Sequence, residues 1–522
     1  MRCFAEYIEG KITETPDGGV CSLPKGEYYI ERHINIENRK DITVDGNGSV
    51  IVSHYNNGNS EKPTSDVFHI FGSARVKLCN FVFDTDTPVN ITGTVESIDT
   101  ENNSYILCVS SCFKVTGKEI FMMQNGCDGD GSFDKSPDYY CADPDKSKIG
   151  LLAGEIVLYG VYTGCKYDYL GNNRYNVFMP GQVMPKLKIG QTICVRHSSY
   201  GPVSILIKNS DDTAIENVTI HSAGGMGIIV LPRSENLYLE NYNVVLPENS
   251  KRMMSGNCDG IHITGLCGKL TMKNCSFSGL GDDALNIHST AATVTAVDKD
   301  NGVIKCNYCK KSPDGLLPPD WCRKGDKITV LNPETCNKTG EFTVKSFEHD
   351  RLSFEFLKGE IESGSVLQNT AFAAAVEIKN CNVRNTRARA FVLQTENIEI
   401  ANCHFYGMSS PAIQAAPDVR RWYEVGPVKN MKIHNNVFEK CGFVNDDIPV
   451  ITVQDNHDKR GVGTPNVHEN IEIAENVFKN KSGRCIFATS TSKIKIIGND
   501  FSDCKIGDDF IECLACDGTD IE

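Results

Sequence analysis

The chain has 522 residues and a formal charge of −14, so it is long enough for one extended hydrophobic core with inserted domains. The negative charge argues against nucleic acid and anionic membrane surfaces as partners, and it favours a neutral ligand over a polyanionic one. No apolar run approaches the roughly 20 residues of a membrane span, and residues 1–9 lack the apolar core of a secretory signal. The 23 cysteines are odd in number and spread along the chain, which favours reduced, buried thiols and a cytoplasmic location.

A short repeat recurs along the chain, with apolar and polar residues alternating before an Asn or Cys and a closing Phe or Val. It occurs at residues 76–83, 237–244, 270–277, 376–383, 398–405, 431–438, 471–478 and 494–501. Alternation with a period of two is typical of a strand with one buried face, and the Asn and Gly residues that follow are typical of turns. The uninterrupted steps, 398 − 376 = 22 and 494 − 471 = 23 residues, match one turn of a parallel β-solenoid.

Stacked rungs should place like residues above one another at roughly 4.8 Å. The repeat predicts two such ladders at the same point of the rung, formed by Cys275, Cys381 and Cys403 and by Asn436, Asn476 and Asn499. A leucine-rich horseshoe has a similar core motif. It requires a further upstream Leu and a helical return, and neither occurs consistently in this chain.

Two long stretches, residues 91–203 and 291–371, lack the repeat and resemble each other. Their short alternating strands and Asp, Asn and Gly turns predict small antiparallel barrels inserted between rungs. The expected organisation is a β-helix in residues 1–90, 204–290 and 372–522, interrupted by these two barrels. Because the second insertion begins just after His288, we expect it to wall a site in the preceding rungs.

Two similar phrases, residues 257–262 and 281–288, bring three carboxylates together. Asp259 and Asp283 are 24 residues apart, so they should occupy equivalent positions of adjacent rungs with Cα atoms roughly 5 Å apart. Asp282 precedes this position by one residue. Three carboxylates this close repel one another, which favours retention of a proton near neutrality. A protonated acid beside ionised carboxylates is suited to hydrolysis of a glycosidic bond, with inversion if side chains splay to roughly 6.5–9.5 Å.

Simpler roles are also open to these residues. An Asp next to Gly is ordinary turn chemistry, and clustered carboxylates also suit calcium. The flanking imidazoles argue against calcium and favour a catalytic site. The Cys-x-x-Cys spacings at Cys306/Cys309 and Cys513/Cys516 are compatible with zinc, but no second pair lies at ribbon spacing, so no metal and no cofactor is expected.

The two phrases Cys-Asp-Gly-Ile-His and Gly-Asp-Asp-Ala-Leu-Asn-Ile-His resemble those of glycoside hydrolase family 110, the bacterial exo-α-1,3-galactosidases. The resemblance extends over essentially the whole chain. It implies an all-β fold, a right-handed parallel β-helix with two inserted β-barrels, and metal-independent inverting hydrolysis of blood-group B-type or linear Gal-α-1,3-Gal glycans. It further implies Asp259 as general acid, with Asp282 and Asp283 activating water.

Further substrate-binding residues are expected around the acids. His262, Asn286 and His288 lie in the same two phrases. Extending the rungs adds Arg389, Gln414 and Arg484, for which a solvated outer face is the alternative. Trp422 or Tyr423, in the loop after Gln414, is expected to supply an aromatic ring for the apolar face of galactose, with ordinary packing as the alternative.

Two alternative functions remain open. A polygalacturonase-like enzyme would share the Asp pair, but Gly-His-Gly is absent and no Arg-x-Lys phrase follows the pair. A non-catalytic carbohydrate-binding β-helix is the other alternative. The expected partner is a glycan with terminal α-galactose, and a homo-oligomer is left open.

Overall fold

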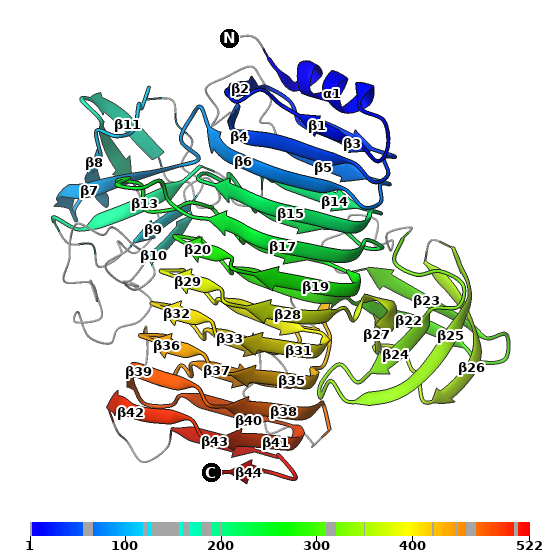
Figure 1. Ribbon diagram of the computed structural model, residues 1–522. Helices are drawn as coiled ribbons and strands as arrows, with labels where there is room; N and C mark the ends of the chain where they lie inside the picture. The colour runs from blue at the N-terminus through cyan, green and yellow to red at the C-terminus, as the bar shows by residue number, and fades with distance from the viewer. Residues whose placement is uncertain are drawn as a thin grey trace.

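The computed structural model describes residues 3–55, 66–117, 119, 123–126, 156–159, 166–178, 187, 189–197, 201–308, 320–348, 350–419, 422–443, 446–455, 466–505 and 510–522. The chain starts with helix α1 (Ala5–Glu14), which lies across the N-terminal end of a stack of strands (Figure 1). Its buried residues Ala5, Ile8 and Ile12 join the core of that stack. The helix thus covers apolar surface that the first rung would otherwise expose.

The stack is a parallel β-helix built from two long sheets, as the repeat predicts. Among the described residues the larger sheet has nineteen strands: β1 (Val20–Ser22), β2 (Glu27–Ile30), β4 (Thr43–Ser53), β6 (Lys77–Thr85), β15 (Asp211–Ile220), β17 (Glu235–Val244), β19 (Cys267–Lys273), β20 (Ser276–Ser278), β28 (Ala375–Lys379), β29 (Asn382–Arg384), β31 (Glu396–Ala401), β32 (His404–Tyr406), β35 (Lys429–His434), β36 (Val437–Glu439), β38 (His468–Ala474), β39 (Val477–Ser482), β41 (Thr491–Ile497), β42 (Asp500–Lys505) and β44 (Asp520–Ile521).

The second sheet carries the residues of the site. Its parallel strands, within the described part of the chain, are β3 (Ile34–Glu37), β5 (Phe68–Phe71), β14 (Ile205–Lys208), β16 (Ile228–Val230), β18 (Ile261–Ile263), β21 (Leu285–Thr290), β30 (Phe391–Gln394), β33 (Ile413–Ala415), β37 (Ile451–Val453), β40 (Ile486–Thr489) and β43 (Ile511–Leu514). A short strand, β34 (Glu424–Val425), pairs with β21 in the antiparallel direction.

The core between the sheets is continuous along the solenoid axis, and like residues stack in it. The rings of Phe405, Phe438, Phe478 and Phe501 lie face to face, with successive centroids 4.8, 5.1 and 4.9 Å apart. These spacings match the distance between neighbouring strands. The stacked apolar column therefore ties each rung to the next.

The two predicted ladders are also present and form one continuous column. The amide of Asn436 donates to Asn476 Oδ1, and that of Asn476 donates to Asn499 Oδ1, both at 3.0 Å. The column passes from Asn to Cys where Asn436 Oδ1 accepts the backbone N–H of Cys403 at 2.8 Å. The described cysteines are free thiols and most are buried, as expected for small apolar side chains.

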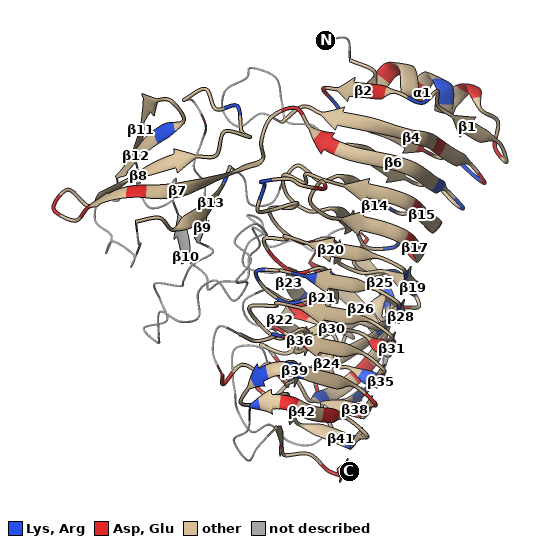
Figure 2. Ribbon diagram, turned by 60° about the vertical axis from the view of Figure 1, so that its left-hand side comes forward, with Lys and Arg blue, Asp and Glu red and all other residues tan. Residues whose placement is uncertain are grey.

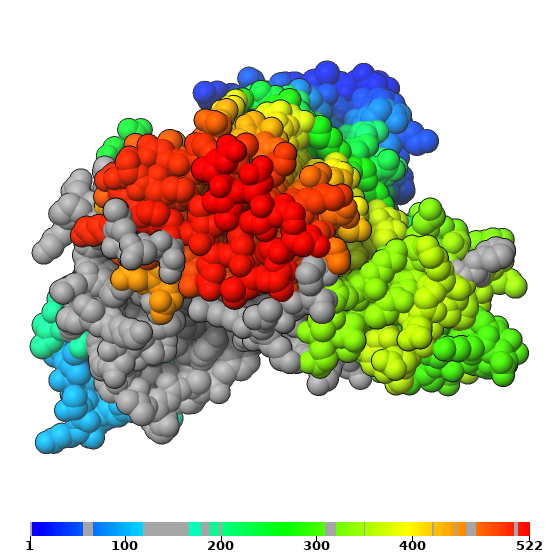
Figure 3. Space-filling model, turned by 90° about the horizontal axis from the view of Figure 1, so that it is seen from below, coloured from blue at the N-terminus to red at the C-terminus, as the bar shows by residue number. Residues whose placement is uncertain are grey.

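The second insertion is a closed antiparallel barrel on one side of the solenoid (Figures 1 and 3). Its strands are β22 (Ala292–Asp298), β23 (Val303–Tyr308), β24 (Lys327–Leu331), β25 (Lys338–Glu348), β26 (Arg351–Gly359) and β27 (Val366–Asn369), followed by the 3-10 helix η2 (Thr370–Phe372). Arg233 of the solenoid forms an ion pair with Asp326, and Trp321 Nε1 donates to Thr290 O at 2.9 Å. These contacts fix the barrel at the end of β21.

The first insertion forms an antiparallel sheet on the other side of the solenoid (Figure 1). In the described residues its strands are β7 (Asn90–Asp99), β8 (Ser104–Val109), β9 (Met123–Gly126), β10 (Ile156–Tyr159), β11 (Lys166–Gly171), β12 (Arg174–Phe178) and β13 (Thr192–Arg196). Ile91, Leu107, Tyr175 and Val195 are buried in a separate small core. The fold is therefore a β-helix with two appended β-structures, each with its own core.

Both basic and acidic residues occur along the strands of the later rungs (Figure 2). They form ion pairs between successive strands, such as Lys379 with Glu399 at 2.9 Å and Lys432 with Glu472 at 2.8 Å. Exposed pairs of this kind contribute little to stability individually. Among the described helices, none has the length and apolar character that a membrane span requires.

Candidate active site

The site lies where β18, β21 and β30 run side by side. Ile261 pairs with Leu285, and Leu285 pairs with Phe391, so the register predicted from the two phrases is confirmed. It also continues across the second insertion, because β30 follows the barrel. By this register Asp259, Asp283 and Arg389 occupy one column, two residues before the paired strand positions.

The glycines of both phrases are required because the rungs approach closely there. A Cβ on Gly260 would lie 2.8 Å from the carbonyl oxygen of Ala284, and one on Gly281 would lie 2.4 Å from that of Asn257. Backbone atoms cannot yield at such distances. The Asp-Gly and Gly-Asp pairs therefore bring consecutive rungs together, which is a different role from ordinary turn chemistry.

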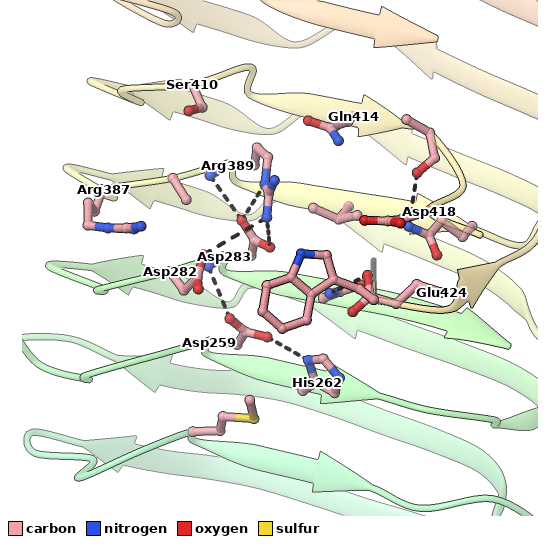
Figure 4. Close-up of a pocket in the computed structure, with 17 residues that line it drawn as sticks. Asp259, His262, Asp282, Asp283, Arg387, Arg389, Ser410, Gln414, Asp418 and Glu424 are labelled. Atoms are coloured by element: carbon pink, nitrogen blue, oxygen red, sulfur yellow. Dashed lines mark hydrogen bonds and ion pairs between the residues drawn. The ribbon is translucent and has the colours of Figure 1, made fainter. Parts of the chain in front are cut away.

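The three predicted acids meet at the surface of the second sheet (Figure 4). Asp259 and Asp283 are 4% and 1% exposed, whereas the side chain of Asp282 is 34% exposed. The backbone N–H of Asp283 donates to Asp259 Oδ1 at 3.3 Å. Asp282 is thus the carboxylate of the three that is most accessible from solvent.

Arg389 holds Asp283 in a bidentate ion pair. Its Nε and terminal nitrogens donate to the two oxygens of Asp283 at 2.7 Å each, and its backbone N–H donates to Oδ1 at 3.1 Å. The same guanidinium lies 3.9 Å from Asp282. Burial raises the pKa of Asp283, and Arg389 opposes this effect. With both oxygens engaged by Arg389, Asp283 is better placed to hold the arginine than to accept a proton.

Asp259 forms a close pair with His262, whose Nδ1 lies 2.6 Å from Asp259 Oδ2. Burial raises the pKa of Asp259 to about 7, against the effect of His262, and the charge of Asp282 adds to the rise. Burial lowers the pKa of His262, but the hydrogen bond and charge of Asp259 outweigh it and raise that pKa to about 9. The pair therefore holds an exchangeable proton near neutral pH.

A second polar cluster adjoins the acids. His288 Nε2 lies 3.3 Å from His262 Nε2 and 3.8 Å from Glu424 Oε1, and Asn286 donates to Glu424 Oε2 at 3.3 Å. Burial lowers the pKa of His288. Burial also disfavours the charge of Glu424, but His288 and His262 outweigh it and lower the pKa of this carboxyl.

A cavity of about 300 Å³ lies above these residues. Of the predicted site residues, all except His288, Arg484 and the alternative aromatic Tyr423 line it: Asp259, His262, Asp282, Asp283, Asn286, Arg389, Gln414 and Trp422. Its volume is at the small end for ligand sites, which suits one sugar residue.

Two of these exceptions contact residues of the cavity lining. His288 Nε2 lies 3.3 Å from Nε2 of His262, which lines the cavity. Arg484 lies three strands beyond Arg389 in the second sheet and forms an ion pair with Glu512 at 2.5 Å. It lines a neighbouring cavity, whose lining also includes Arg389 and Gln414.

Three further polar residues line the cavity and were not predicted from the sequence: Arg387, Asp418 and Glu424. Arg387 stands two residues before Arg389, so the rung alignment contained a signal for it. Glu424 had no such signal, because β34 joins β21 in the antiparallel direction from a loop outside the repeat. Asp418 and Glu424 exchange backbone hydrogen bonds at 2.7 and 2.9 Å, which closes that loop over the site.

The expected wall of the site is different in the structure. None of the described residues that line the cavity belongs to 292–369, so the described part of the second barrel does not form the expected wall. The loop of Asp418, Trp422 and Glu424 takes that position instead. The contact of Trp321 with Thr290 attaches the barrel at the end of β21 that lies away from Asp283.

The first insertion supports the turn that carries Asp259. Asn90 Nδ2 donates to Asn257 Oδ1 at 3.0 Å, and Asn257 Nδ2 donates to Val89 O at 2.9 Å. The buried guanidinium of Arg196 donates to the carbonyl of Asn257. These contacts hold the backbone two residues before the acid.

The geometry of the three acids bears on calcium and on inversion. One oxygen from each of Asp259, Asp282 and Asp283 lies within 4.8 Å of the others. Calcium would compete for Asp283 with Arg389, which already occupies both of its oxygens. The spacing is also shorter than the roughly 6.5–9.5 Å typical of inverting glycosidases.

The comparisons first define the class of protein. The family described as "Right handed beta helix region" matches residues 360–501, in agreement with the parallel solenoid. The chain is a right-handed parallel β-helix protein.

Relatives along most of the chain are more specific. Alpha-1,3-galactosidase B of Bacteroides thetaiotaomicron is 26% identical over 89% of this chain and 74% of its own length. Alpha-1,3-galactosidase A of Bacteroides fragilis is 24% identical over 94% and 81%. Alpha-1,3-galactosidase B of Akkermansia muciniphila is 28% identical over 60% of this chain and 40% of its own length. The expected resemblance to glycoside hydrolase family 110 is confirmed by these similarities.

Proposed function

We propose that this protein is an exo-acting α-1,3-galactosidase that removes terminal α-1,3-linked galactose from blood-group B-type or linear Gal-α-1,3-Gal glycans. The observation that carries the proposal is the pair of Asp259 and His262 beside Asp282 in the lining of a one-sugar cavity. The names of the relatives supply the substrate class. No cofactor takes part in the reaction.

In this proposal Asp259 is the general acid. Its pKa of about 7 keeps a proton available at neutral pH, and the 2.6 Å contact with His262 allows that proton to be replaced. The proton passes to the glycosidic oxygen as the bond from that oxygen to the anomeric carbon breaks. The galactosyl group then carries developing positive charge, which the adjacent carboxylates stabilise.

Asp282 activates the attacking water. It is the most exposed of the three acids, and the guanidinium of Arg389 lies 3.9 Å from it. Asp283 positions Arg389 through the bidentate pair and so acts as a positioning residue. This assignment narrows the water-activating role, which sequence analysis gave to both residues of the Asp pair.

We further propose inversion at the anomeric carbon. One oxygen of each of the three carboxyls lies within 4.8 Å of the others, which is closer than inversion requires. The attacking water and the leaving oxygen must therefore contact the carboxyl oxygens that point away from one another. Asn286 and Gln414 bind sugar hydroxyls, and the ring of Trp422, which is 39% exposed, packs on the apolar face of galactose.

The test is incubation with the branched B trisaccharide and with Gal-α-1,3-Gal, with the released sugar followed by NMR. β-Galactose as the first anomer is the expected result. α-Galactose first would replace inversion by a double displacement. Release of galacturonate from polygalacturonate, with no galactose from either glycan, would favour the polygalacturonase-like alternative. Binding of the glycans without release would identify a non-catalytic carbohydrate-binding protein.

A further inference from the structure

The two imidazoles beside the acids face each other through atoms of the same kind. His288 Nδ1 lies 3.2 Å from the carbonyl oxygen of Ser289, which only accepts hydrogen bonds, so Nδ1 carries the hydrogen. His262 Nδ1 likewise faces Asp259 Oδ2. The two Nε2 atoms face each other at 3.3 Å. Either a hydrogen on one of them or a metal ion between them satisfies this contact.

The spacing of these nitrogens suits tetrahedral zinc. Two ligand nitrogens about 2.0–2.1 Å from a tetrahedral Zn²⁺ lie about 3.4 Å apart. A carboxylate is at hand, since Glu424 Oε1 is 3.8 Å from His288 Nε2. Ligand atoms of His262, His288 and Glu424 all lie within 4.8 Å of one another, so movement of Glu424 toward the two nitrogens completes a three-ligand set.

Each of the three side chains is also oriented by a further hydrogen-bond partner, as is typical of metal ligands. A carboxylate orients His262, a backbone carbonyl orients His288, and the amide of Asn286 orients Glu424 through its other oxygen at 3.3 Å. The backbone of Glu424 is fixed in turn by antiparallel pairing with Thr290. Preorganisation of this kind is what distinguishes a built site from a chance cluster.

We propose that His262, His288 and Glu424 form a Zn²⁺ site. His262 and Glu424 line the cavity, which gives the ion a route of entry and leaves the fourth coordination position for water or a ligand hydroxyl. Binding displaces whatever proton lies between the two Nε2 atoms. Because His262 and Glu424 both line the cavity, an ion held between them takes up space that the sugar needs. Zinc is therefore an inhibitor of the proposed hydrolysis and has no part in its mechanism.

Binding is tested without reference to catalysis. The full chain, stripped with a chelator, is titrated with zinc chloride by calorimetry, and the expected result is one ion per chain with micromolar or tighter affinity. His288→Ala and Glu424→Gln should each weaken binding at least tenfold. His221→Ala is the matched control, because His221 also faces a backbone carbonyl, that of Val245 at 3.0 Å, but stands outside the cluster.

Two further measurements distinguish this site from zinc binding elsewhere on the chain. Co²⁺ in place of Zn²⁺ should give a visible spectrum without a thiolate charge-transfer band, which separates this site from binding by cysteines. Zinc should raise the melting temperature of the His221→Ala variant and of the unmodified chain, and not that of folded Glu424→Gln. Absence of stoichiometric binding, or equal binding by the His288 and Glu424 variants, overturns the site. The expected inhibition rests on the proposed function and is therefore measured in a separate assay. Added zinc should stop hydrolysis, and EDTA should restore it.

Discussion

Replacement of Asp259 by Asn tests the assignment of the general acid. The substitution keeps the shape of the side chain and removes the proton that the leaving oxygen needs. General acid catalysis contributes about 10²- to 10⁴-fold, or about 3–5 kcal/mol of the barrier. The upper part of this range is expected, because Asp259 is 4% exposed and water cannot readily replace it as a donor. We therefore expect kcat/KM on Gal-α-1,3-Gal to fall about 10³-fold or more.

The leaving group provides the discriminating assay. A dinitrophenyl α-galactoside releases an acidic phenol that needs no protonation, so the variant should lose less than about tenfold on this substrate. Asp86→Asn is a matched control, because Asp86 pairs with His54 at 2.8 Å outside the cavity, and its activity should be unchanged. Equal losses of Asp259→Asn on the two substrates would refute the role of acid and assign Asp259 to another step.

Three further outcomes are expected. On the disaccharide, kcat/KM should decline as the pH rises through about 7, because Asp259 then loses the proton it must donate; a pH-independent rate between 6 and 8 would contradict this. Arg389→Gln leaves Asp283 buried without its cation and should lower the free energy of unfolding in urea by about 3–5 kcal/mol, whereas adding Asp283→Asn should recover most of the loss. Asn436→Ala removes hydrogen bonds to both neighbouring rungs and should cost about 2–3 kcal/mol, while Asn436→Cys should cost less, because Cys403 fills the equivalent position one rung earlier; equal costs in urea unfolding would argue against the ladder.

The repeat made the β-helix predictable, because its period fixes which residues stack. Aligning Asp259 with Asp283 gave the register of β18 and β21, and continuing the column gave Arg389 beside Asp283. The same column also pointed to Arg484, but equivalence in the repeat says nothing about distance along the axis, and the intervening strands carry Arg484 into the next cavity. Alignment of the rungs therefore predicts which face of the solenoid a residue belongs to better than it predicts how close two residues lie.

Glu424 marks the limit of this approach. It reaches the site through two antiparallel pairs with β21, formed after the chain has left the repeat, so no periodic signal announces it. The second insertion was misplaced for a related reason. Adjacency in sequence to His288 suggested a wall, but the direction in which a barrel leaves the solenoid depends on anchoring contacts such as that of Trp321 with Thr290.

The chemistry of the site follows from the rung spacing itself. Stacking puts Asp259 and Asp283 in adjacent strands, and burial there makes two full negative charges costly. The chain relieves this cost unequally: Arg389 neutralises Asp283, whereas Asp259 has only a histidine and a shared proton. Supplying both acids with arginine would stabilise the fold and eliminate the raised pKa. Among its described hydrogen-bond partners, Asp259 has no guanidinium. Its pKa therefore stays high, and one acid of the column remains able to donate a proton.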